Sequence, residues 1–189
     1  MSAESRDADT GQTDATGAAE ASPIQSGPAS SEWFVLHSRP RCEKKASQSC
    51  LDLEVTHFFP LHERSHRRGN RSYSFDVPLF PGYLFACCDK EQRLAVLRTG
   101  YLVRTIEVID QERLLTELQN VYLACSGGAD LILYPQLKRG RQVRVLRGPL
   151  TGVYGRISKR KEAMRLVLNV TILGTAVATE MDMDDVELI

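Results

Sequence analysis

The chain has 189 residues, enough for one medium domain or two small ones, and its 24 basic residues balance its 24 acidic residues. It has no apolar run of the roughly 18 residues that a membrane span needs, and no apolar N-terminal stretch, so we expect neither a span nor a signal peptide. The charges are unevenly spread: residues 136–165 hold ten Lys and Arg and one acid, whereas residues 180–189 hold five acids. Such a basic segment suits a polyanion such as nucleic acid, and a solvated domain face is the alternative.

Residues 1–31 are predicted to form a disordered tail. They contain seven Ala, six Ser, three Gly, three Thr and two Pro, with Met1 and Ile24 as the only large aliphatic residues. This composition buries too little apolar surface to offset the entropy lost when a backbone is ordered. We favour a passive extension over a segment that recruits a partner.

A first domain is predicted over residues 32–124, because strand and helix patterns alternate there. The expected architecture is α+β, an α/β sandwich in which helices pack on one mostly antiparallel sheet. Gly69 and Asn70 mark the turn of a hairpin, and Asp110 is a candidate helix cap. The expected elements are strands at 33–36, 55–61, 80–87 and 101–108, hairpin arms at 64–68 and 71–77, and helices at 40–53, with Ser38 as a candidate cap, 90–98 and 110–122.

A second, smaller domain is predicted over residues 138–189. Residues 125–137 contain Ser126-Gly127-Gly128 and Pro135, and are predicted to be a linker. From Gly140 onward the pattern changes to short strands, which predicts a five-stranded β-barrel of SH3-like size. The expected strands are 142–146, 154–160, 164–171, 175–180 and 185–188.

The sequence holds no pattern typical of catalysis or metal binding. The five cysteines show no Cys-x-x-Cys spacing, and Cys87 and Cys88 point to opposite faces of a strand, so we expect reduced thiols in a cytoplasmic protein. His57, His62 and His66 lie in a segment that looks like a strand, where their spacing does not make a metal site. Without a Gly-x-Ser-x-Gly motif or a glycine-rich phosphate loop, we expect no catalytic residues, no cofactor, no metal and no enzymatic activity.

Two stretches carry most of the functional information. Residues 77–85, Val-Pro-Leu-Phe-Pro-Gly-Tyr-Leu-Phe, place an aromatic-rich strand behind a Pro-Gly entry. Residues 142–157 form a strand, a Gly148-Pro149 turn and a second strand, with basic residues at alternate positions. Neither contains a nucleophile, so both indicate a protein that grips other macromolecules.

Both stretches, in this order and at this separation, resemble the NusG/RfaH family of transcription elongation factors, as does the strand that begins at Trp33. The resemblance covers roughly residues 32–189. It implies an NGN-type first domain and a KOW-type barrel, whose central glycine is matched by Gly155. Some ribosomal proteins also contain the KOW module, so a ribosome-associated RNA-binding protein is the alternative, and a purely structural adaptor is a third hypothesis.

The aromatic residues of the first domain are the predicted polymerase-binding site. By alternation, Phe80 and Leu84 share one face of their strand while Tyr83 and Phe85 share the other. The residues alone favour an ordinary core, but the resemblance implies a recess that grips the paired clamp helices of the large subunit of RNA polymerase. It also implies pause suppression or antitermination, by what we expect to be a monomer. The predicted polymerase-binding residues are Trp33, Phe80, Tyr83 and Phe85.

Two further surfaces are predicted to bind partners. Basic residues of the first helix and of the hairpin are predicted to contact DNA phosphates, with solvated charge as the default. The apolar tip of the barrel is predicted to meet a ribosomal protein or a termination factor, although these residues would also serve to close the end of the barrel. The predicted DNA-binding residues are Arg41, Lys44, Lys45, Arg67, Arg68 and Arg71, and the predicted tip residues are Leu150, Val153 and Tyr154.

Overall fold

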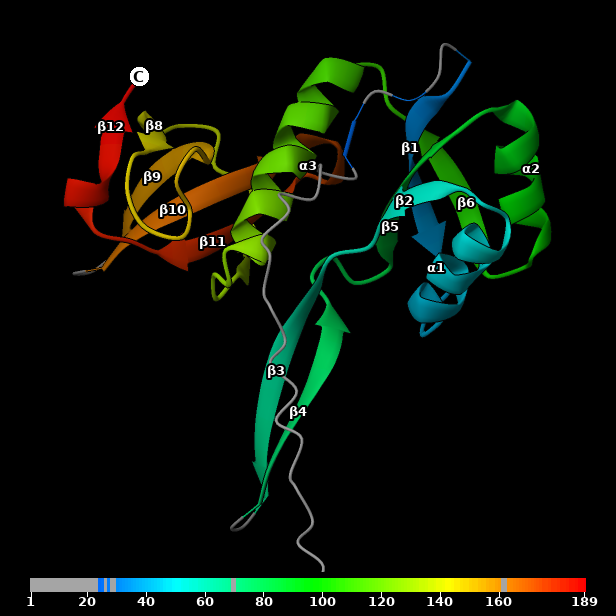
Figure 1. Cartoon of the computed structure of the whole chain (residues 1–189), viewed down its shortest axis with the longest axis horizontal. Coiled ribbons are helices and arrows are strands. Elements are labelled where there is room, and N and C mark those ends of the chain that lie inside the picture. Colours follow the sequence, from blue (N-terminus) through cyan, green and yellow to red (C-terminus); the bar gives the residue numbers. More distant parts are fainter. Residues whose placement is uncertain (1–23, 26, 28–29, 69–70, 161–162) are drawn as a thin grey trace, which may run out of the picture.

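The structure, a computed structural model, describes residues 24–25, 27, 30–68, 71–160 and 163–189. The hairpin turn predicted at Gly69-Asn70 and most of the predicted tail lie outside the described residues. Two sheets lie on either side of helix α3 (Gln111–Ser126), and a two-stranded hairpin projects away from both (Figure 1). None of the helices in the described part of the chain is both long and apolar enough to cross a membrane.

The first sheet is a four-stranded antiparallel sheet with helices on both faces. One face packs Leu36 and Leu84 against α1 and α2, and the other packs Val35 and Phe85 against α3. The α+β class predicted from the alternation of strands and helices is confirmed. In spatial order the strands are β2 (Thr56–Phe58), β5 (Tyr83–Cys88), β1 (Glu32–Ser38) and β6 (Leu102–Glu107), and the covering helices are α1 (Glu43–Asp52) and α2 (Lys90–Arg98).

Helix α3 forms where the sequence provides both a cap and an apolar stripe. The Asp110 carboxylate accepts a hydrogen bond from the Arg113 amide at 3.1 Å, which satisfies one of the unpaired amides of the first turn. Leu114, Leu118 and Val121 recur at helical spacing and are buried. The helix runs to Ser126, four residues beyond its predicted end.

The second sheet has six strands, one more than predicted. The five expected strands are present to within one residue at each end. The sixth, β7, lies inside the segment predicted to be a linker and pairs with β11, because its backbone satisfies an edge of that strand. In spatial order the strands are β12 (Val186–Leu188), β8 (Gln142–Val145), β9 (Tyr154–Arg160), β10 (Ala163–Val170), β11 (Thr175–Glu180) and β7 (Ile132–Pro135).

Helix α3 joins the two sheets through specific polar contacts. On one side the Gln111 side chain donates to the carbonyl of Trp33 in β1 and accepts from its amide, both at 2.9 Å. On the other side the Tyr154 amide of β9 donates to Asn120 Oδ1 at 2.8 Å, and the Thr171 amide donates to Glu117 at 2.7 Å. The helix is therefore a shared wall between the two units.

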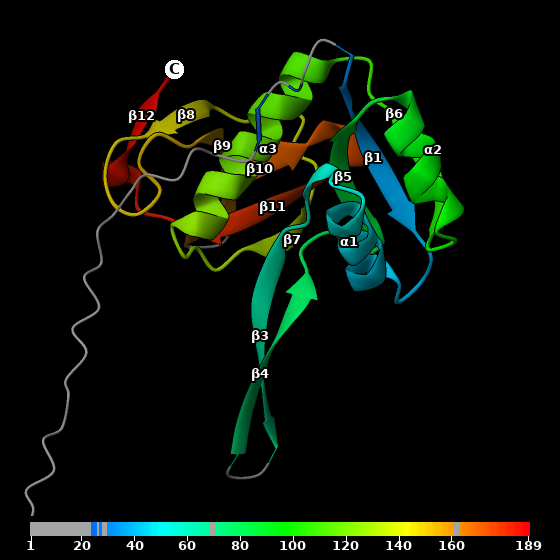
Figure 2. The same ribbon diagram turned by 45° about the vertical axis from the view of Figure 1, so that its right-hand side comes forward.

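The hairpin consists of β3 (Leu61–Arg68) and β4 (Arg71–Pro78), which form a separate two-stranded sheet. Prolines flank it, and a proline lacks the amide that would continue a ladder into the first sheet. The Leu79 amide donates to the Pro60 carbonyl at 2.9 Å and closes the base of the arm. The arm extends away from the body in both views (Figures 1 and 2).

The end of the predicted tail differs from the expectation of disorder. Ile24 is fully buried in the core beneath α3, and its carbonyl accepts from Gln119 at 3.2 Å. The Trp33 indole donates to the Gln25 carbonyl at 2.9 Å. A single large aliphatic residue close to the first strand has enough apolar surface to anchor this short piece of chain.

Candidate macromolecule-binding surfaces

The aromatic residues predicted to grip polymerase are mostly core residues. Trp33, Phe80 and Phe85 expose 1%, 2% and 0% of their surface. They pack with Leu118 and Val121 of α3 in one cluster. The structure therefore brings the predicted residues together, but as a covered cluster and not as an open recess.

Phe80 lies on the opposite side from the one predicted. Its ring meets that of Phe85 edge-on with centroids 5.9 Å apart, whereas Leu84 faces α1 and α2. Alternation fails here because β5 begins only at Tyr83, and Gly82 before it has φ +83°, a left-handed conformation. A strand period does not extend through such a turn.

Tyr83 is the member of the predicted set that reaches the surface. It is half-buried, and its ring stacks on that of His37 with centroids 5.0 Å apart. The Ser38 amide donates to the Gly82 carbonyl at 2.9 Å, so the backbone beneath the pair is held in place. A large, positioned, partly exposed aromatic pair is suited to anchor a protein partner.

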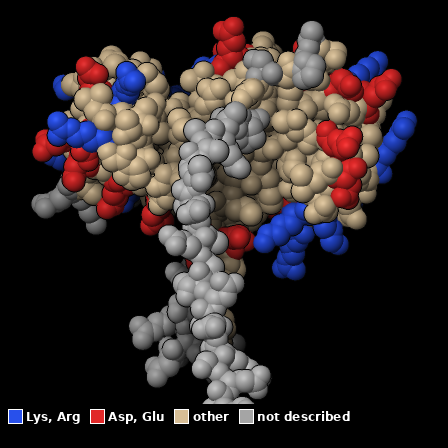
Figure 3. All heavy atoms as spheres, viewed as in Figure 1, with Lys and Arg blue, Asp and Glu red and all other residues tan. Residues whose placement is uncertain are grey.

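The basic residues predicted on the first helix are available to a polyanion. Arg41, Lys44 and Lys45 are exposed, and Lys45 Nζ lies 5.8 Å from the centroid of the Tyr101 ring. Lys and Arg side chains gather beside α1 (Figure 3). The predicted hairpin arginines belong to the strands of the arm, where Arg68 pairs with Arg71 and Arg67 with Ser72, but their side chains lie outside the described residues.

The tip of the barrel is largely closed. Leu150 is 5% exposed and Val153 is fully buried, while Tyr154 is 44% exposed and lies 5.6 Å from the Arg144 guanidinium. The Pro149 carbonyl passes so close to Gly127 that a side chain there would collide with it. These residues were predicted either to bind a partner or to close the end of the barrel. In the structure Leu150 and Val153 are buried at the end of the barrel next to α3.

Gly155, the residue matched to the central glycine of the KOW module, allows a close approach between strands. A Cβ at this position would lie 2.7 Å from a Leu166 methyl and 2.9 Å from a Leu168 methyl. A glycine within a strand permits this close approach, so the role of Gly155 is packing.

The cysteines and His57 are structural residues. All five cysteines are unpaired, and burial raises the pKa of Cys50 to about 12 and the pKa values of Cys88 and Cys125 to about 11. Burial lowers the pKa of His57, whose ring is held by the Ser47 hydroxyl at 2.8 Å. In the part of the chain that the structure describes, no three His, Cys, Asp or Glu side chains gather into a metal site.

Comparison with known proteins finds a family match for the first domain. Residues 31–120 match the family model NusG, described as transcription termination factor nusG. Among curated proteins, no sequence matches the chain. Two solved structures are similar to it: one titled "Domain interaction in Thermotoga maritima NusG" (18% identity, 84% of this chain and 97% of that chain covered, TM-score 0.47), and a crystal structure of the MjSpt4:Spt5 complex (12% identity, 83% and 97% covered, TM-score 0.23).

The matched residues include the whole first sheet, α1 and α2, the hairpin and most of α3. The family matched by these residues is one of non-enzymatic transcription factors that act in elongation and its regulation. Residues 31–120 are NusG-like, as the motif at residues 77–85 predicted, whereas the motif at residues 142–157 lies outside the match.

Proposed function

We propose that this protein is a transcription elongation factor that docks on RNA polymerase through its first domain and opposes pausing and termination. The observation that carries the proposal is the NusG match over residues 31–120. The same residues fold into one body that carries a partly exposed aromatic pair and a basic helix. The action is positional: a factor that bridges the polymerase cleft disfavours the open, paused form.

We assign the polymerase contact to the surface around Tyr83 and His37, with Trp33, Phe80 and Phe85 as its buried support. The proposed partner is the pair of clamp helices of the large subunit. Interface anchors are enriched in aromatic residues set in well-packed surroundings. Tyr83 has such surroundings, because its ring stacks on His37 and its strand is hydrogen-bonded on both sides.

The remaining surfaces complete the proposed assembly. Arg41, Lys44 and Lys45 of the first domain would contact the phosphates of DNA held by the polymerase. The barrel would recruit a ribosomal protein or a termination factor through Tyr154, the exposed residue of its tip. Use of the buried Leu150 and Val153 by that partner would require the barrel to separate from α3. We further propose that the protein acts in the cytoplasm as a monomer.

Polymerase binding by the full-length chain tests the proposal. Tyr83→Ala should weaken binding to purified RNA polymerase by about 2 kcal/mol or more, because it removes a positioned anchor. Tyr101→Ala is the matched control, since Tyr101 is a half-buried tyrosine of the same domain that lies next to Lys45. Wild-type protein that does not bind polymerase, or a folded Tyr83→Ala variant that binds equally well, would contradict the proposed docking.

A ribosome-associated RNA-binding protein is the second candidate, and the basic strand β9 favours it. Arg156 and Lys159 lie on that strand, and Lys159 is exposed. Capture from a lysate treated with nuclease separates the two functions. Polymerase retained without RNA supports the elongation factor, whereas ribosomal material that is lost with the RNA supports the alternative.

A further inference from the structure

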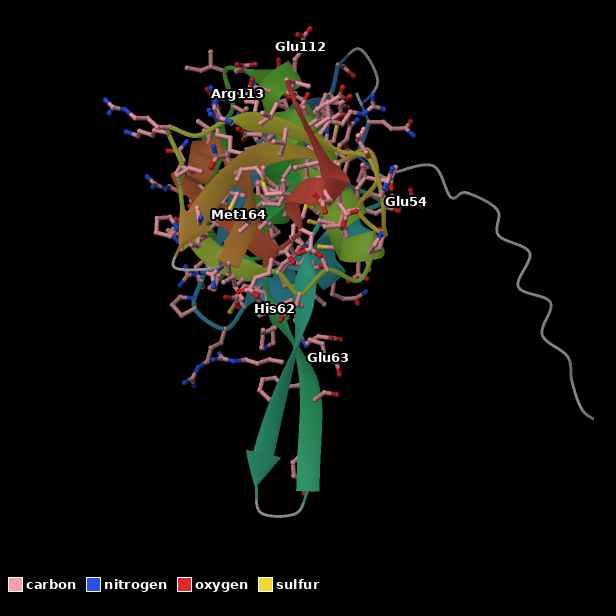
Figure 4. All side chains as sticks on the ribbon, turned by 90° about the vertical axis from the view of Figure 1, so that its left-hand side faces the viewer. Glu54, His62, Glu63, Glu112, Arg113 and Met164 are labelled. Atoms are coloured by element: carbon pink, nitrogen blue, oxygen red, sulfur yellow. The ribbon has the colours of Figure 1, made fainter. Side chains whose placement is uncertain are left out.

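The projecting hairpin has two chemically different faces. In its register Arg64 lies opposite Phe75 and Glu63 lies opposite Asp76. Directly opposite residues share a face and neighbours along a strand do not, so Arg64 and Phe75 lie on one face while Glu63 and Asp76 lie on the other. Glu63 projects from one side of the arm (Figure 4).

The aromatic side chains of this arm are not covered. Tyr73 is 52% exposed and Phe75 is 48% exposed, and among the described strands those of the arm pair only with each other. Ser74, between them, belongs to the acidic face. Two aromatic rings therefore stand on the same face as Arg64, outside any core.

The arrangement of charge works against the stability of the hairpin. Like charges directly opposite each other are destabilising, and here Glu63 faces Asp76 in the register. An arm selected for stability alone would place opposite charges across the strands. The observed order instead separates the acids from the aromatic face, which leaves that face suited to an anion.

The spacing of the two rings suits nucleobases. Residues two apart on a strand are separated by about 6.8 Å, twice the rise of about 3.4 Å per base along a nucleic-acid strand. Neighbouring rings at that distance leave room for a base on each ring or for one base between them. Arg64 on the same face is placed to meet the phosphates.

We propose that this face of the hairpin binds a single nucleic-acid strand, stacking its bases on Tyr73 and Phe75 and pairing its phosphates with Arg64. The site recognises unpaired bases, since the rings need an accessible base face. It does not depend on the proposed contact with polymerase. A site that bound only acidic peptides would need Arg64 but not two aromatic rings at this spacing.

Fluorescence anisotropy of the full-length chain with short labelled oligothymidylate and oligouridylate, without polymerase, tests this site. Tyr73→Ala combined with Phe75→Ala should weaken binding at least about tenfold, because each ring carries a stacked base. Ser74→Ala, which lies between them on the other face, should change binding by less than about twofold. Both strands should bind, since stacking does not read the 2′-hydroxyl, and the tighter one identifies the natural ligand.

Two further measurements keep the test independent of how the variants fold. In the unmodified protein, backbone amide signals of Tyr73 and Phe75 should shift on titration with the oligonucleotide. The same sequence annealed to its complement should bind about tenfold more weakly, because its bases are already stacked. The proposal is overturned if neither oligonucleotide binds, if the double variant binds like wild type, or if Ser74→Ala loses as much affinity.

Discussion

The aromatic residues around β5 and those of β4 differ in what covers them. Phe85 of β5 is fully buried beneath α3, whereas Phe75 of β4 is 48% exposed on an arm whose two strands form a sheet of their own. Both lie in antiparallel pairs with regular register, at nearly the same distance from a Pro-rich boundary. The comparison teaches that an aromatic strand becomes core or interface according to whether a distant helix covers it.

The largest effect should come from exchanging the two phenylalanines for alanine. Phe85→Ala leaves a cavity in a close-packed cluster and should destabilise the protein by about 3–5 kcal/mol, whereas Phe75→Ala should cost less than about 1 kcal/mol. The measurement is urea denaturation of each variant followed by circular dichroism. Similar losses of stability for the two variants would contradict the assignment of Phe85 to the core and of Phe75 to the surface.

A smaller loss of stability should follow from weakening the contact between α3 and the barrel. Asn120→Ala removes the acceptor of the Tyr154 amide and leaves this part-buried donor unpaired, so the free energy of unfolding should fall by about 1–2 kcal/mol. Amide signals of Leu150 and Val153 should broaden or shift as the barrel separates from α3. Thr116→Ala, one turn earlier and exposed, is the control and should leave those signals unchanged.

Alkaline pH should weaken the other face of the first sheet. Burial raises the pKa of Cys50 from 9.0 to about 12, so its contribution to stability is complete below about pH 9 and is lost as the pH rises toward 12. At pH 10.5 the unfolded thiol is ionised and the folded one is not, a loss on the order of 1–2 kcal/mol. The urea midpoint should therefore fall more between pH 8 and pH 10.5 in wild type than in Cys50→Ala, and equal falls would contradict the assignment.

The smallest expected effect concerns the exposed charges at the start of α1 and just before it. If Arg41, Lys44 and Lys45 contact phosphates in an elongation complex, neutralising each one should lower the slope of log affinity against log salt by about one unit. Glu43 lies beside them but holds the Gly82 amide at 3.1 Å, so Gln48→Ala, exposed on the same helix, is the better control. A slope equal to that of wild type would make these residues ordinary solvated charges.

Much of the fold followed from local patterns. Helix α2 occupies the predicted residues 90–98, and the strands of the barrel lie within one residue of their predicted ends. The strand β7 was missed because four residues in a Gly- and Pro-flanked segment carry little signal of their own. Helix α1 begins at Glu43 and not at the expected Pro40, since Arg41 has φ +63° and a right-handed helix does not include that conformation. Ser38, the expected cap, is instead the last residue of β1.

The candidate site was less predictable than the fold. The resemblance selected Trp33, Phe80 and Phe85, which the structure buries, together with Tyr83, which it leaves half-exposed. Tyr73 and Phe75, the most exposed aromatics of the first domain, were not selected. The sequence did offer a signal for this surface, namely the alternation Tyr-Ser-Phe-Asp over residues 73–76 and the arginine at position 64 on the paired strand. A strand face that packs in a core would carry apolar residues and no arginine.

By itself the sequence determined which residues share a face within a regular strand or helix, because those periods are properties of neighbouring residues. It failed at Phe80, which precedes the left-handed turn at Gly82. It also determined the motif at residues 77–85, which lies within the NusG match. Only the tertiary structure decided which faces are covered, since the cover comes from residues far along the chain: Gln111, which holds Trp33, is 78 residues away from it. The hairpin has no such partner in the described part of the chain, and that difference in long-range packing separates its exposed rings from the buried ones.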